Sequence, residues 1–317
     1  MKTIEETQDH VYNGKWEDLM PTIPNGSIDL IITSPPYNVN LGNNKHKKDS
    51  YDSYDDNMPY GDYLSWMEQL FYACNRVLKR GGRLCINIGD GANGSIPTHA
   101  DFTNLLTRVD DGIGFKKKNT YPLQYTDGEE LQYYSDINKE WRISVDNEDG
   151  IEPFEMMTTI VWDKNQIGAS TAWGSWQSPS QPSFPTQFEF IIVVGKGTTK
   201  HTGDKEKITV SGDNFIRNSR ALWTFPPETK MMKEYDHPAM FPEELPRRLM
   251  DQLTYREDVV LDPFSGAGTT CATAKKMGRH YIGFEMSEKY HNKALDRLSL
   301  IPELDHTRDV CLPKWMK

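Results

Sequence analysis

Six short apolar runs divide the chain and predict buried strands, at residues 28–32, 83–89, 156–162, 188–194, 258–261 and 281–285. Between the first two runs, apolar residues recur at helical spacing: Leu64, Met67, Phe71, Cys74 and Leu78. They predict an amphipathic helix from Asp62 to Arg80, with Gly81 and Gly82 as its C-terminal stop. Strand, helix and strand in this order form a βαβ unit, which implies a parallel sheet with a right-handed crossover.

The pattern weakens in two other parts of the chain. From about 90 to 150 we expect loops around a helix at 99–109. Residues 196–235 lack a clear period and predict a separate, mostly irregular subdomain. A strand, a glycine loop, a helix at 271–277 and another strand follow toward the end of the chain, so the predicted fold class is α/β.

The composition is that of an ordinary globular protein. The 317 residues suffice for one large domain or two modest ones, and 37% apolar residues can bury a core. Apolar runs such as 191–194 are far too short to cross a bilayer, and the N-terminus shows no signal-peptide pattern, so we expect a cytoplasmic protein away from membranes. The four cysteines form no Cys-x-x-Cys pair and indicate neither disulfides nor zinc.

The net charge of −10 argues at first against a nucleic-acid partner, since phosphate binding draws on lysine and arginine. The charge is unevenly distributed, however. Residues 121–157 contain ten acids and two bases, whereas residues 196–233 contain eight bases and four acids. A polar, basic loop at 42–54 with interleaved tyrosines could clamp a phosphate backbone, although most charged runs are simply solvated surface. This distribution leaves room for a basic face.

A proline-rich stretch, Thr33-Ser34-Pro35-Pro36-Tyr37-Asn38, directly follows the first apolar run. Each proline fixes its own φ and favours extended geometry in the residue before it, so the strand ends in a stiff, exposed turn. A rigid carbonyl beside the Ser34 hydroxyl can hold an exocyclic amino group by both hydrogens, and Tyr37 offers a flat face for stacking. The stretch suits a pocket for an aminated nucleobase, although a lone stretch of this kind is more often a plain surface turn.

A second stretch, Asp262-Pro263-Phe264-Ser265-Gly266-Ala267-Gly268-Thr269-Thr270, lies between a predicted strand and a predicted helix. Strand, glycine loop and helix form the layout of a nucleotide-cofactor site. The loop has neither a third glycine nor a Gly-Lys-Ser/Thr sequence, which disfavours a dinucleotide and a nucleoside triphosphate. Glu285 ends the next strand, where its carboxylate can accept both ribose hydroxyls of an adenosine. This block favours cofactor binding over a plain turn.

Together, the two stretches resemble the S-adenosylmethionine-dependent DNA methyltransferases that modify exocyclic amino groups. The catalytic stretch precedes the cofactor stretch, which is similar to the circularly permuted beta class of that family. The segment His237-Pro238-Ala239-Met240-Phe241-Pro242-Glu243-Glu244-Leu245 and the run Trp173-Gly174-Ser175-Trp176 match as well, and the resemblance extends from about residue 12 to 300. It implies a Rossmann-like, mostly parallel, seven-stranded methyltransferase sheet, circularly permuted, with an inserted recognition region.

The resemblance also implies how the chain is divided. Residues 1–195 would form the catalytic half of the methyltransferase domain, 196–235 the target-recognition region and 236–317 the cofactor-binding half. Double-stranded DNA is the implied partner, and we expect 42–54 and 196–235 to contact it. This expectation rests on the eight bases of residues 196–233, among which Lys205, Lys207, Arg217 and Arg220 are the ones whose replacement by alanine should weaken DNA binding.

The resemblance assigns roles to single residues, and no metal is among them. The implied catalytic residues are Ser34, Pro35, Pro36 and Tyr37. The implied S-adenosylmethionine ligands are Asp262, Phe264, Gly266, Gly268, Thr269, Glu285, His237 and Phe241. The family often has Gly-Asp near the N-terminus, where the acid helps to hold the cofactor adenine. Here the chain reads Tyr12-Asn13-Gly14-Lys15-Trp16, and Asn13 is the residue that could substitute.

The implied mechanism needs no covalent nucleophile. Hydrogen bonds to the Ser34 hydroxyl and the Pro35 carbonyl would localise the amino lone pair for direct attack on the sulfonium methyl group. Serine at the first catalytic position is usual in the family for cytosine, and Asp or Asn for adenine, so we favour N4 of cytosine over N6 of adenine. Cytosine-C5 chemistry is rejected because none of the four cysteines follows a proline.

Other interpretations differ in substrate or in activity. Pro-Pro-Tyr pockets also hold glutamine amides, which makes a protein or RNA methyltransferase the main alternative, but those relatives resemble the unpermuted order. A non-catalytic nucleic-acid-binding module would not need both motifs intact. The chain has no spare domain for a nuclease, so a restriction endonuclease partner would be a separate polypeptide, and the sequence leaves a homodimer open.

Overall fold

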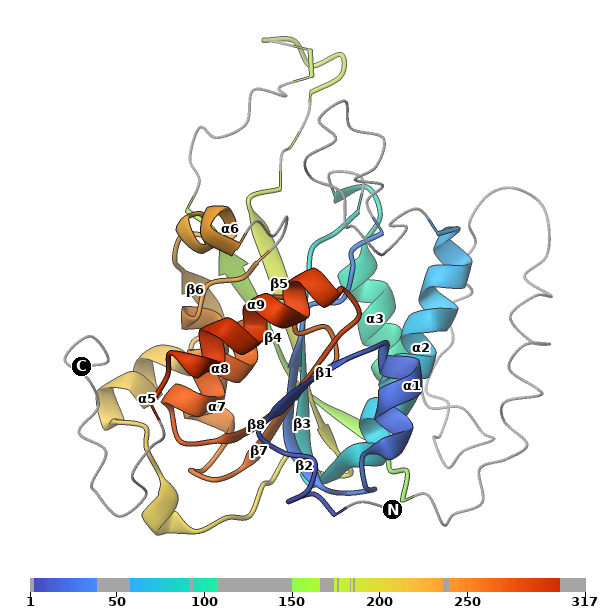
Figure 1. Cartoon of the computed structure of the whole chain (residues 1–317). Helices are drawn as coiled ribbons and strands as arrows, with labels where there is room; N and C mark the ends of the chain where they lie inside the picture. The colour runs from blue at the N-terminus through green and yellow to red at the C-terminus, as the bar shows by residue number, and fades with distance from the viewer. Residues whose placement is uncertain are drawn as a thin grey trace.

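The computed structural model describes residues 3–38, 58–91, 94–107, 150–165, 174–175, 177–182, 184, 186–235 and 240–302. One sheet of eight strands, in the order β1-β8-β7-β2-β3-β5-β4-β6, runs through the middle of the described chain (Figure 1). Its strands are β1 (His10–Asn13), β2 (Ile28–Thr33), β3 (Leu78–Ile88), β4 (Phe154–Asp163), β5 (Phe188–Lys196), β6 (Leu222–Thr224), β7 (Val259–Asp262) and β8 (His280–Glu285). The predicted α/β class with a mostly parallel sheet is confirmed, although the sheet has eight strands where seven were expected.

Strand direction defines two edges of this sheet. The strands β1, β8, β7, β2 and β3 are parallel neighbours, β5 is antiparallel to both β3 and β4, and β6 is parallel to β4. Because β5 alone is reversed, all the other strands point toward one edge, which we call the carboxyl edge, and start from the opposite amino edge. Motifs that follow two of these parallel strands therefore lie at the same edge.

Helices cover both faces of the sheet. They are α1 (Trp16–Leu19), α2 (Tyr60–Val77), α3 (Thr98–Thr107), α5 (Gly212–Asn218), α6 (Lys230–Tyr235), α7 (Glu244–Leu253), α8 (Thr269–Lys276) and α9 (Glu288–Ser299), with the 3-10 helices η1 (Met20–Thr22) and η6 (Lys205–Lys207). Figure 1 shows α1, α2 and α3 on one side of the strands and α7, α8 and α9 on the other. The helices predicted at 99–109 and 271–277 thus correspond to α3 and α8.

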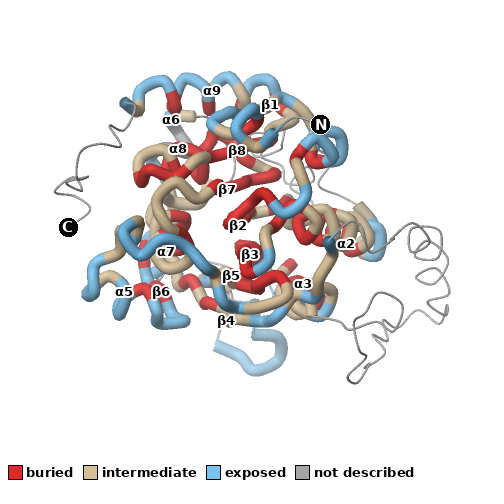
Figure 2. The backbone as a smooth tube through the Cα atoms, turned by 90° about the horizontal axis from the view of Figure 1, so that it is seen from below, coloured by how far each residue is buried: buried red, intermediate tan, exposed pale blue. Residues whose placement is uncertain are grey.

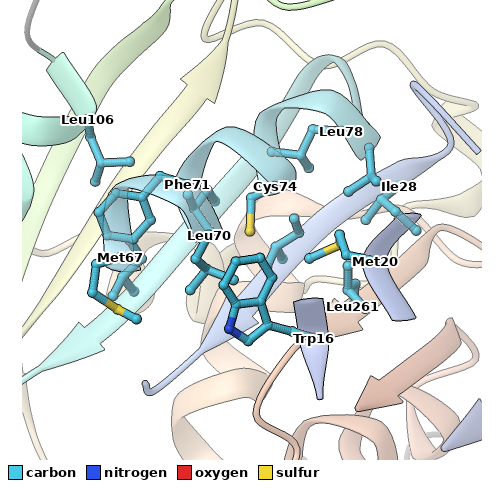
Figure 3. Packing of buried hydrophobic residues seen from close by; sticks show 14 of the residues in the cluster. Trp16, Met20, Ile28, Met67, Leu70, Phe71, Cys74, Leu78, Leu106 and Leu261 are labelled. Atoms are coloured by element: carbon cyan, nitrogen blue, oxygen red, sulfur yellow. The ribbon is translucent and has the colours of Figure 1, made fainter. Parts of the chain in front are cut away.

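Two apolar cores lie between the sheet and these helix layers. Successive residues of a strand point to opposite faces, and in β2 Ile31 packs into the core with α1, α2 and α3, whereas Leu30 and Ile32 pack into the core with α7, α8 and α9. Figure 2 shows the strands as the buried centre of the molecule. Figure 3 shows the first core, where Trp16 and Phe71 gather with other apolar residues from helices and sheet.

The C-terminal end predicted for the helix from Asp62 to Arg80 is wrong. The helix α2 ends at Val77, and the two glycines expected to stop it lie inside β3. A Cβ atom on Gly82 would lie 3.1 Å from the carbonyl oxygens of both Ile28 and Asp29, and one on Gly81 would lie 2.2 Å from the carbonyl oxygen of Lys200. The glycines therefore allow neighbouring backbones to approach β3 closely, which is a common use of glycine in strands.

Residues 196–235 do not form a separate subdomain. Their short strand β6 pairs with β4 at the end of the main sheet, because Trp223 is buried in the second core and anchors it there. The Trp223 indole donates to the carbonyl of Asn218 at 3.1 Å, which ties α5 to the same place. No helix in the described residues has the length and apolar composition of a membrane span.

Candidate active site

The two sequence motifs meet at the carboxyl edge. The strands β2 and β7 pair in parallel, with Leu30 beside Val260, so Ser34 and Asp262 lie at the ends of adjacent strands. The chain continues from β2 to β3 through α2 on one face, and from β7 to β8 through α8 on the other face. The strand order therefore reverses between β2 and β7, and open α/β sheets bind their ligands at the carboxyl ends of strands at such a point.

The turn after β2 is fixed by hydrogen bonds as well as by its prolines. Pro35 is buried, and the carbonyl of Pro36 accepts a bond of 2.7 Å from the Tyr63 hydroxyl on α2. Asn38 bonds both backbone groups of Met58: its Oδ1 accepts from the amide at 2.8 Å and its Nδ2 donates to the carbonyl at 2.7 Å. The turn is thus held on the segment that leads into α2.

Ser34 and Tyr37 of this turn belong to a polar network. Its other members come from β3, from β5 and from the residues just after β4. The Ser34 hydroxyl donates to the Tyr37 hydroxyl at 3.0 Å, and the Tyr37 hydroxyl donates to Glu189 Oε2 at 3.0 Å. Asn87 Nδ2 donates to the same carboxylate oxygen at 2.7 Å and to the Tyr37 hydroxyl at 2.8 Å. Lys164 Nζ forms an ion pair with Glu189 Oε1. The structure therefore brings Ser34 and Tyr37 together and adds three polar residues that sequence reasoning missed.

The sequence holds a faint signal for two of the three. Asn87 and Glu189 are polar residues inside the otherwise apolar runs 84–88 and 188–194. Burying a polar group costs free energy unless it is bonded, so a polar residue at the end of a buried strand is a candidate for a functional role. Lys164, just after β4, carries no such signal. Its role depends on the pairing of β4 with β5, which places Trp162 beside Glu189.

Glu285 and the glycine loop are bonded to each other. Glu285 Oε2 accepts from the amide of Gly266 at 2.9 Å, and Oε1 accepts from the amide of Ser287 at 2.8 Å. Asn13, in the neighbouring strand β1, donates from Nδ2 to the backbone carbonyl of Glu285 at 2.9 Å. The half-buried Glu285 carboxylate and Asn13 thus lie together at the carboxyl end of β8, next to the glycine loop.

Asp262 is a buried acid at the start of this loop. Its oxygens accept from the Thr270 hydroxyl at 2.6 Å and from the amide of Phe264 at 3.1 Å. Burial outweighs these bonds and raises the pKa of Asp262 to about 6. Asp262 therefore shapes the loop from inside, and its carboxylate is fully surrounded by protein.

The other predicted cofactor ligands lie in the loop, pack on one of the two cores, or lie beyond the described residues. Phe264 is half-buried and packs on the first core, and Phe241 packs on the second. The Thr269 hydroxyl is buried and accepts from Arg297 Nη1 at 3.0 Å, so it serves the loop's own structure. His237 lies outside the residues that the structure describes.

Four of the basic residues predicted to contact DNA lie toward the amino edge. They are Lys205, Lys207, Arg217 and Arg220. The η6 helix is fixed there because Lys207 forms an ion pair with Glu257, just before β7. The two arginines come shortly before β6, which starts from that edge. Ser34 is separated from the amino edge by the length of β2, about 20 Å. The predicted loop 42–54 and the tryptophans at 173 and 176 lie outside the described residues.

The chain is similar in sequence to a family of DNA methylases and to proteins named as type II methyltransferases. Residues 28–296 match the model of the N6_N4_Mtase family, described as DNA methylase. The type II methyltransferase M.MjaVI of Methanocaldococcus jannaschii is 33% identical over 215 residues, which is 68% of this chain and 85% of the relative. The type II methyltransferase M.BglII of Bacillus subtilis is 27% identical over 297 residues, which is 92% of this chain and 69% of the relative.

Solved structures share the fold. The cytosine-N4-specific PvuII DNA methyltransferase matches 94% of this chain and 87% of its own, with a TM-score of 0.55 at 18% identity. A protein of Thermus thermophilus, provisionally described as a DNA modification methylase and solved with S-adenosyl-L-methionine, matches 91% of this chain and 94% of its own, with a TM-score of 0.56 at 22% identity. At these identities the similarity concerns the arrangement of the sheet and its helices.

Proposed function

Because the chain belongs to the family of N6- and N4-amino DNA methyltransferases, we propose that it transfers the methyl group of S-adenosylmethionine to N4 of cytosine in double-stranded DNA. Membership confirms the family that the two motifs predict, with S-adenosylmethionine as the cofactor and DNA as the substrate. The preference for N4 of cytosine over N6 of adenine is the part that we propose.

The hydroxyl of Ser34 carries this proposal. Its hydrogen has two protein acceptors, the Tyr37 hydroxyl at 3.0 Å and the Asn87 carbonyl at 3.2 Å. A hydroxyl whose hydrogen is engaged in this way offers its lone pairs to an incoming amino group. With the Pro35 carbonyl as the second acceptor, both amino hydrogens would be held. Serine at this position is the residue that the family resemblance links to cytosine; N6 of adenine is the alternative.

On the cofactor side, the contacts at the tip of β8 support two further assignments. The half-buried Glu285 carboxylate accepts from the amides of Gly266 and Ser287, and a carboxylate oxygen can accept more than one hydrogen bond, so it suits a pair of ribose hydroxyls. Asn13 lies beside it, bonded to its backbone, and supplies a polar side chain where the family often has an acid. We assign the ribose to Glu285 and the adenine to Asn13.

The reaction product tests the choice of base. DNA of mixed sequence, treated with enzyme and cofactor, is expected to contain N4-methylcytosine by nucleoside mass spectrometry. Ser34→Ala should lower the rate on the order of 100-fold, because an acceptor of the reacting amino group is lost, while cofactor affinity measured by calorimetry stays the same. The exposed Ser299→Ala is the matched control and should leave both unchanged. N6-methyladenine as the sole product would overturn the base assignment and leave the family intact.

DNA must approach the carboxyl edge, because Ser34 lies there. Figure 1 shows the described part of 174–184, between β4 and β5, standing out at the top of the molecule, with α6 also on the upper side. We therefore propose that these segments contact DNA, and that only the part of 196–235 after β6 contributes to target recognition.

The proposed substrate also indicates the enzyme's surroundings. We infer a cytoplasmic location, because the proposed substrate is the DNA of the cell. Two relatives are named type II methyltransferases, which supports a restriction endonuclease with the same recognition sequence as a separate polypeptide. Methyl-aware sequencing of the treated DNA would give that recognition sequence.

A further inference from the structure

We propose that Glu189 receives the proton that the target amino group loses on methylation, through the hydroxyls of Ser34 and Tyr37. The proposal rests on the proposed amino methylation and holds for either base, because both cytosine and adenine react at an exocyclic amino nitrogen. It gives Glu189 a chemical role in addition to its ion pair with Lys164.

The proton balance of the reaction calls for such an acceptor. Bound S-adenosylmethionine supplies the methyl group, and its sulfur keeps the electron pair of the broken bond. The amino nitrogen has then used its lone pair and carries a positive charge, so one N–H bond must break and return its electrons to the nitrogen. The Ser34 oxygen takes this proton as its own passes to the Tyr37 oxygen, and the Tyr37 proton passes to Glu189. Each hydroxyl ends neutral, and one proton is added to the carboxylate.

The hydrogen bonds along the relay point in the direction of this transfer. Ser34 donates to Tyr37, and Tyr37 donates to Glu189 Oε2, each at 3.0 Å. The side-chain amide of Asn87 donates to the two oxygens that follow Ser34 in the relay, at 2.8 Å to the Tyr37 hydroxyl and at 2.7 Å to Glu189 Oε2. The reverse orientation of the amide would set its oxygen against the carboxylate, so the Asn87 orientation is fixed by charge. Asn87 therefore holds the two acceptors in line without taking the proton.

The Glu189 carboxyl group must release its proton after each reaction, and its surroundings suit this. Lys164 binds Oε1, which leaves Oε2 directed at Tyr37. The side chains of Glu189 and Lys164 are 12% and 24% exposed, so the pair is shielded from bulk water yet lies close enough to the surface to release a proton. Gly89 makes room for this arrangement, since a Cβ there would lie 3.2 Å from the Tyr37 ring and 3.5 Å from Glu189 Cγ.

Single-turnover methylation across a pH series tests the relay. Glu189→Gln keeps the size of the side chain and removes its basicity, so the rate should fall on the order of 100-fold and the acid limb of the pH profile should disappear. Tyr37→Phe keeps the ring for stacking and breaks the relay at its middle. The double variant should be no slower than the slower single variant, because both changes interrupt one path. Glu155→Gln, an exposed change in β4, is the matched control and should behave like the parent.

A spectroscopic measurement accompanies the kinetics. Difference infrared spectra taken after one turnover should show a new protonated carboxyl band in the parent that is absent from Glu189→Gln. A parent enzyme that methylates DNA while Glu189→Gln keeps its rate and acid limb would overturn the relay. Additive losses in the double variant would do so as well and would leave Glu189 as a support for Tyr37. A parent that methylates no DNA at all would count against the proposed function instead, so the two failures are distinct.

Discussion

Ala294 on α9 leaves almost no space for a side chain in the glycine loop. Gly268 has a φ of +74°, and a Cβ atom on it would lie 3.0 Å from the Cβ of Ala294. Gly266 also has a positive φ, of +51°, and its amide is bonded to Glu285. Glycine is needed at Gly268 both for the backbone angle and for the contact with the neighbouring helix.

Gly268→Asp is therefore expected to abolish cofactor binding, because it adds a side chain and a charge where the backbone approaches the ligand. Gly26→Asp is the matched control: its φ is +60°, but a Cβ there would meet nothing within 4 Å. Calorimetry with S-adenosylmethionine should show no binding for the first variant and parental binding for the second. Equal affinities in the two variants would refute the assignment of the loop.

At the scale of elements, predictions succeed where a period is long and unbroken. The strand at Ile28–Thr33 and the start of α2 follow directly from apolar spacing. The edge strands β1 and β6, of four and three residues, are too short to show a period, and tertiary pairing decides them. The sequence predicts a helix stop at the glycines of β3 because the backbones that approach them are distant in the sequence, Lys200 at Gly81 and Ile28 and Asp29 at Gly82.

The two parts of the site differ in how far apart their residues lie in the sequence. Ser34 and Tyr37 are neighbours in the sequence, so a motif can reveal them. The other three residues of the network meet them only because β3, β5 and β4 lie side by side and carry Asn87, Glu189 and Lys164 at or near their ends. The order of strands in a sheet cannot be deduced from the spacing of apolar residues.

A pair of glycine substitutions tests the account of β3. Gly81→Ala should lower the free energy of unfolding by about 2 kcal/mol or more, since φ is +78° and the backbone of Lys200 is in the way. Gly61→Ala, in the first turn of α2 with no atom within 4 Å of the new Cβ, should raise it by up to about 1 kcal/mol. Urea denaturation followed by circular dichroism measures both. A Gly81→Ala protein as stable as the parent would show that β3 can move away from Lys200.

At the scale of the whole molecule, the two edges of the sheet should differ in their response to DNA. Lys230→Ala, in α6 after β6, is expected to reduce the slope of log affinity against log salt by about 0.9, because one phosphate contact releases about one counterion. The double change Lys205→Ala and Lys207→Ala, toward the amino edge, should leave the slope unchanged. The opposite pattern in a binding titration would move the DNA surface to the amino edge.

The pairing of β2 with β7 and of β1 with β8 also decides when the enzyme becomes active during its synthesis. The turn with Ser34 leaves the ribosome early, but β2 gains its second neighbour only after β7 has been made, and β1 is fixed only by β8. Contacts between such distant segments form slowly, because a long loop must close first. A nascent chain that lacks β7 and β8 thus carries the proposed base-holding turn before the proposed cofactor site can form.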